Sequence, residues 1–224
     1  MNQIISTNEL FEGNKSLFQD IEELIKSKNF PCLFALNSFH KNHMYFYDTR
    51  EITGSYYEEI YNNLLNFWAN FINPNGKTFY TIILILNPIS KTSHDTIKNF
   101  VFSFLINLKR QDIASPNLTI DDILNSDFEF RLSNTTWFPV FLCSNHPTLL
   151  RNSPITLIAI QPKITFDNLK KQPNEFYEKV RQATHRRINN IYKNNKPFYL
   201  SDKSSGINAI QYIGFDPNHI ETDH

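Results

Sequence analysis

His146 stands where an apolar run of the sequence gives way to a short polar turn, within residues 137–151. Pro147 follows it directly, and Arg151 comes five residues after it. A strand that ends in a rigid turn can hold a side chain over a cavity, and histidine commonly binds a metal or moves a proton near neutral pH. A histidine beside a proline more often closes a hydrogen-bonded turn, so the sequence leaves a structural role open as well.

Other polar clusters fit surface roles better than chemical ones. His40 and His43 could hold a metal, but the polar residues between them favour a solvated hairpin tip. A charged helix face is expected at His185, Arg186 and Arg187. Such a face more often lies exposed to solvent than binds an anion. The sequence has no glycine-rich phosphate loop, no H-E-x-x-H zinc motif and no G-x-S-x-G elbow. No nucleotide cofactor is therefore expected.

Composition narrows the class of protein. The 224 residues are 41% hydrophobic, and 22 basic residues balance 22 acidic ones, so no general attraction to nucleic acid or to an anionic membrane is expected. Two cysteines cannot build a disulfide framework, and both lie in apolar runs that predict buried free thiols. The N-terminus lacks a signal-peptide pattern, and the longest apolar run, residues 79–86, is too short to cross a bilayer. We expect a cytoplasmic protein with no membrane partner.

The hydrophobic periodicity predicts alternating helices and strands. Helices are expected from about Ser16 to a stop at residues 29–31, from Ser55 to residues 73–76, and over residues 93–110 and 174–192, with a short one at 119–125. Strands are expected over residues 32–36, 44–48, 79–86, 128–132, 138–143 and 156–160. The sequence thus predicts one α+β domain over residues 1–224, with loose ends at 1–14 and 216–224. Its mixed, mostly antiparallel sheet should have about five or six strands packed with about four helices.

Several segments, in this order and spacing, resemble one protein family. Residues 28–35 followed by the strand at 44–48 resemble the N-terminal signature of the YqcI/YcgG family, and residues 138–147 resemble its strand that ends in His-Pro. Residues 151–167 resemble its next strand, and residues 180–188 and 211–212 match more loosely. The resemblance covers about residues 28–215.

The resemblance implies a haem-dependent oxygenase that uses dioxygen and an electron donor to N-hydroxylate a small guanidino or amino compound. It makes His146 the candidate axial ligand of a haem b iron, with the sixth position left for dioxygen. Arg151, Arg186 and Arg187 are candidates for the haem propionates, because guanidinium groups pair well with carboxylates.

Other features of the resemblance leave alternatives open. Asp48 and Glu51 follow the second strand and are candidate partners for a cationic, arginine-like substrate. Only Arg151 follows the His-Pro step here, where the hydroxylase branch carries several arginines, and Cys143 could ligate iron as a thiolate instead of His146. A non-catalytic haem or small-ligand binding module and a cofactor-free interaction protein are the alternatives. The oligomeric state stays open.

Overall fold

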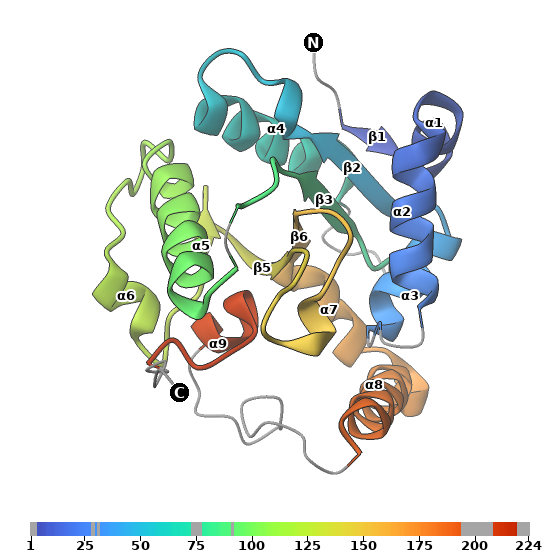
Figure 1. Ribbon diagram of the computed structural model, residues 1–224. Helices are drawn as coiled ribbons and strands as arrows, with labels where there is room; N and C mark the ends of the chain where they lie inside the picture. Colours follow the sequence, from blue (N-terminus) through green and yellow to red (C-terminus); the bar gives the residue numbers. More distant parts are fainter. Residues whose placement is uncertain are drawn as a thin grey trace.

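The sheet is the centre of the fold. The computed structural model describes residues 4–27, 30, 32–72, 78–90, 92–193 and 208–218. Within them, one six-stranded sheet runs in the order β1-β2-β3-β6-β5-β4 (Figure 1). The β2–β3 pair is parallel and the other pairs are antiparallel, which confirms the predicted α+β fold. The strands are β1 (Ile5–Ser6), β2 (Met44–Asp48), β3 (Thr81–Ile85), β4 (Arg131–Leu132), β5 (Thr135–Leu142) and β6 (Leu157–Pro162).

The sheet register sets which side chains share an end of the sheet. β3 is mostly apolar, rich in isoleucine and buried at all five positions, as a central strand should be. Asp48 at the end of β2 pairs with Ile85, which pairs with Leu157, which in turn pairs with Leu142 at the end of β5. The carboxyl ends of β2, β3 and β5 therefore lie at one end of the sheet, and the start of β5 lies at the other.

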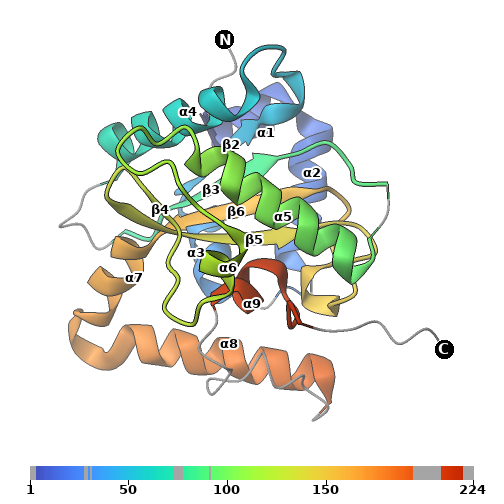
Figure 2. The same ribbon diagram turned by 90° about the vertical axis from the view of Figure 1, so that its left-hand side faces the viewer.

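Helices cover both faces of the sheet (Figures 1 and 2). One face packs against α1 (Thr7–Gly13), α2 (Lys15–Lys26) and α3 (Leu33–His40). The other packs against α4 (Tyr56–Phe71), α5 (His94–Lys109), α6 (Ile120–Leu124) and α9 (Asn208–Ile213). α7 (Lys163–Lys170) follows β6 directly, and α8 (Phe176–Tyr192) runs along one end of the molecule, against α3 and α7. The helix faces bury two apolar cores, one on each side of the sheet.

The four long helices that the sequence predicts form as α2, α4, α5 and α8. They are the longest helices in the described part of the chain. The short helix expected at 119–125 forms as α6, with a capping box between Thr119 and Asp122. In α4 the expected cap at Ser55 makes no side-chain hydrogen bond. Residues 29 and 31, expected to stop the first helix, lie outside the described residues; α2 ends at Lys26.

The prediction of a strand over residues 32–36 is wrong, because this segment begins α3. The Sγ of Cys32 accepts a hydrogen bond from the backbone N–H of Ala35 at 3.4 Å and caps the helix. Phe34 packs into one apolar cluster and Phe39 into another. A helix that is buried on two sides shows an unbroken apolar run, which periodicity alone does not separate from a buried strand.

Two further predictions need correction. Within the predicted loose end at residues 1–14, Ile5–Gly13 are ordered, because β1 pairs with β2 and a capping box between Ser6 and Glu9 starts α1, which buries Leu10. The strand expected over residues 128–132 is confined to β4. No helix among the described residues is both long and apolar enough to cross a membrane.

Candidate functional site

The turn after β5, residues 143–153, forms as the sequence predicts. The backbone N–H of Cys143 donates to the carbonyl of Arg151 at 3.2 Å, and that of Ser153 donates to the carbonyl of Cys143 at 3.0 Å. Asn145, with φ of 55°, takes the left-handed conformation that asparagine tolerates. The turn directs His146 inward, where only 5% of the residue is exposed.

Both ring nitrogens of His146 have partners. The backbone N–H of Thr148 donates to Nδ1 at 3.0 Å, so Nδ1 must carry a lone pair. Nε2, 3.0 Å from the carbonyl oxygen of Ile213, then carries the proton and donates it. Burial, helped by the nearby charge of Arg151, lowers the pKa of His146 to about 3. The imidazole is therefore neutral at physiological pH, in one fixed tautomer.

Arg151 lies beside this ring, under the end of α9. Its Nη2 donates to the carbonyl of Gln211 at 2.9 Å, while its Nε is enclosed without a hydrogen-bond partner. No ion pair to a carboxylate holds Arg151 in the described part of the chain, and burial lowers its pKa to about 10. Gly214, with φ of +85°, covers both side chains: a Cβ there would lie 2.7 Å from Cγ of Arg151 and 3.4 Å from Cε1 of His146.

The residues assigned to haem iron by resemblance do not fit an iron porphyrin in this arrangement. Iron needs a lone pair on one imidazole nitrogen, and both nitrogens of His146 are engaged. Moving the Ile213 carbonyl away is not sufficient, because a lone pair on Nε2 places a proton on Nδ1, against the N–H of Thr148. Cys143 lies fully buried in the apolar core, where burial raises the pKa of its thiol to about 12.

The remaining candidates from the sequence lie apart from His146. Asp48 caps the 3-10 turn Thr49–Glu51 and pairs with Arg50 at 2.6 Å. It lies at the same end of the sheet as His146, but its strand β2 is three strand spacings, about 14 Å, from β5. Glu51 is exposed on the same turn. Arg186 and Arg187 lie on α8, where Nη2 of Arg187 donates to the carbonyl of Ser27 at 3.4 Å. The fold thus brings only Arg151 to His146.

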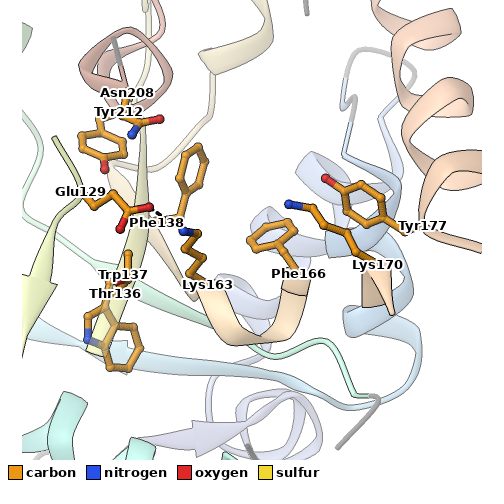
Figure 3. Close-up of a pocket in the computed structure, with 10 residues that line it drawn as sticks. All are labelled: Glu129, Thr136, Trp137, Phe138, Lys163, Phe166, Lys170, Tyr177, Asn208 and Tyr212. Atoms are coloured by element: carbon orange, nitrogen blue, oxygen red, sulfur yellow. Dashed lines mark hydrogen bonds and ion pairs between the residues drawn. The ribbon is translucent and has the colours of Figure 1, made fainter. Parts of the chain in front are cut away.

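A second place has the shape of a binding site. A cavity of about 270 Å³ opens where the start of β5, α7, α8 and α9 meet, and we call it the α7–α9 pocket (Figure 3). One wall carries Glu129, Lys163 and Phe138, and the facing wall carries Phe166, Lys170 and Tyr177. The residues that line it are Glu129, Thr136, Trp137, Phe138, Lys163, Phe166, Lys170, Tyr177, Asn208 and Tyr212.

Aromatic rings form most of the surface of this pocket. The ring centroid of Phe138 lies 5.5 Å from that of Tyr212 and 6.2 Å from that of Phe166. The Phe166 ring also packs on the Phe79 ring, with a centroid distance of 4.9 Å. Burial raises the pKa of Tyr212 to about 12, so its hydroxyl stays protonated, and the oxygen accepts from the N–H of Phe130 at 3.4 Å. Such a surface can hold a flat ligand by ring contacts.

Three charged groups stand at the pocket. Nζ of Lys163 donates to Glu129 at 2.6 Å, and Arg131 pairs with the other oxygen of the same carboxylate at 3.0 Å. These hydrogen bonds lower the pKa of Glu129 and raise that of Lys163. Lys170 is held more loosely, 3.7 Å from Asp167, with its Nζ 5.4 Å from the centroid of the Tyr177 ring.

Sequence reasoning missed this pocket, although one signal for it exists. Lys163, Phe166 and Lys170 are spaced i, i+3, i+7, which places them on one face of a helix. That spacing has meaning only once α7 is recognised, and α7 was not expected. For metals, no three His, Cys, Asp or Glu side chains come together as a possible site anywhere in the described ranges.

Comparison with known proteins gives one match. Residues 21–221, most of the chain, match the model of the YqcI/YcgG family. No curated protein and no solved structure matches the chain.

Proposed function

This chain belongs to the YqcI/YcgG family, and from that premise we propose that it binds a small, flat organic ligand in the α7–α9 pocket. The observation that carries the proposal is the convergence of aromatic rings and a loosely paired ammonium group on one open cavity. Concave sites lined by rings, with a few polar groups to orient the ligand, are the usual form of small-molecule sites. Membership of the family leaves the ligand itself open.

The volume of the pocket limits the ligand. About 270 Å³ lies just below the range of roughly 300–1,000 Å³ that is usual for drug-sized ligands. One or two fused rings fit that space, and a porphyrin does not. The pocket is therefore proposed as a site for a substrate-sized molecule and not for the haem macrocycle.

The proposal is tested by filling the pocket. Thr136 lines the cavity, and its neighbour Thr135 does not. Thr136→Trp should abolish binding of flat one- and two-ring compounds in isothermal titration calorimetry, while Thr135→Trp, at a neighbouring position that does not line the cavity, should leave it unchanged. If Thr136→Trp binds such compounds as well as the wild type does, the ligand site lies elsewhere.

The second proposal is the haem-dependent N-hydroxylation of a guanidino or amino compound in the cytoplasm, with an external electron donor. One observation favours it: Arg151 carries a buried guanidinium with an unpartnered Nε, a group suited to a propionate carboxylate. The same arrangement opposes it at His146, whose nitrogens are both engaged. Haem binding through Nδ1 of His146 requires that Thr148 first gives up its hydrogen bond to the ring, and binding through Nε2 requires that Ile213 gives up its hydrogen bond as well.

A further inference from the structure

Lys170 brings an incompletely neutralised positive charge to the α7–α9 pocket. In Figure 3 its side chain extends from α7 into the gap and points toward the wall that carries Phe138. Its ion pair with Asp167 spans 3.7 Å, and about half of the side chain (51%) is exposed. An ammonium held this loosely can turn to a ligand without breaking a strong hydrogen bond.

Glu129, by contrast, is already neutralised. Its two oxygens pair with Lys163 at 2.6 Å and with Arg131 at 3.0 Å. A cationic ligand would therefore meet a carboxylate that two basic side chains already hold. Among the lining residues, two lysines face one glutamate, so the pocket carries a net positive charge.

From these charges and rings we infer that the ligand of the α7–α9 pocket is a flat aromatic carboxylate. Its ring packs among Phe138, Phe166 and Tyr177, and its carboxylate pairs with Nζ of Lys170. This inference rests on the proposed function and deepens it. It also separates this pocket from a site for a cationic guanidino compound, for which the charge has the wrong sign.

The test compares a charged probe with its neutral isostere. Full-length protein is titrated with 2-naphthoate and with 2-naphthamide by isothermal titration calorimetry at neutral pH. We expect 2-naphthoate to bind up to about fivefold more tightly than 2-naphthamide, as one partly exposed ion pair allows. Lys170→Met should remove that preference by weakening 2-naphthoate alone, and Lys170→Arg should retain most of it because it keeps the charge.

Lys171→Met is the matched control, because Lys171 is the exposed neighbour of Lys170 and does not line the pocket. It should leave both affinities within about twofold of the wild type. Equal binding of the two probes, or an unchanged preference in Lys170→Met, would overturn the carboxylate inference and leave the pocket itself in place. If neither probe binds, or if both bind undiminished to Thr136→Trp, the pocket proposal fails together with the inference.

Discussion

The backbone N–H of Thr148 donates to Nδ1 of His146 over 3.0 Å, and this hydrogen bond leaves the single ring proton on Nε2. Nε2 donates that proton to the carbonyl oxygen of Ile213, the last residue of α9, which lies 67 positions later in the chain. The side chain of Thr148 strengthens the same connection, because Oγ1 donates to the carbonyl of Gly214 at 2.6 Å. The His-Pro turn is thus joined to the C-terminal helix by two buried hydrogen bonds.

This buried imidazole should make stability depend on pH. The pKa of His146 is about 3 in the folded protein, whereas an unfolded histidine titrates near 6.5. As the pH falls below about 6.5, only the unfolded chain takes up this proton, so the stability present above that pH is progressively lost. The free energy of unfolding should fall by about 2 kcal/mol between about pH 6.5 and pH 5. Urea denaturation across this window measures it.

His146→Gln is the variant that isolates this effect, because its amide cannot titrate yet can still donate to Ile213. It should remove most of the slope above about pH 5, a range in which carboxylates of low pKa, such as Glu129, stay ionised. His43→Gln is the control; burial lowers the pKa of His43 as well, but His43 is only half-buried. An unchanged slope in His146→Gln would show that His146 is accessible to protons in the folded state.

Haemin should not bind through His146 while Thr148 and Ile213 keep their hydrogen bonds to its ring. Titration of the purified protein with haemin should give the same Soret band in the wild type and in His146→Ala, because neither ring nitrogen is available to iron. His40→Ala, at an exposed histidine on α3, controls for adventitious ligation. A histidine-ligated spectrum that only His146→Ala abolishes would instead support the second proposal and show that Thr148 gives up its hydrogen bond to the ring.

A buried ion pair holds the end of α5 to the β4–β5 hairpin. Nζ of Lys109 donates to Asp112 at 2.7 Å and to the carbonyl of Arg131 at 2.9 Å, and Asp112 also accepts from the N–H of Ser133 at 3.1 Å. Lys109→Met leaves the carboxylate without its cation and should cost about 3–5 kcal/mol in urea denaturation. Lys98→Met, which removes a pair with the exposed Asp95, should cost far less. Similar losses in both variants would contradict this role.

The sequence predicted secondary structure well where the residues of a segment alone determine it. β2 and the helices α4 and α5 were predicted nearly to their ends, because their periodicity and boundary residues agree. The turn that carries His146 was also predicted. α3 was not, because Phe34 and Phe39 are buried in different clusters and erase the helical period.

The site could not be predicted in the same way. The inward position of His146 depends on Ile213, and the pocket depends on Phe138, Tyr177 and Tyr212 from three separate elements. A local sequence pattern does not predict contacts between segments so far apart in the chain. The resemblance identified the family, but it could not show that Thr148 and Ile213 engage both nitrogens of the ring.

Trp137 offers the most direct test of the α7–α9 pocket, because it lines the cavity and the chain contains only two tryptophans. In ¹⁵N-labelled protein, the two indole N–H signals can be followed by NMR while 2-naphthoate is added. We predict that the Trp137 signal shifts saturably, that the Trp68 signal shifts less, and that Thr136→Phe, which narrows the cavity without adding an indole, abolishes the shift. Binding of 2-naphthoate that leaves the Trp137 signal in place would contradict the account.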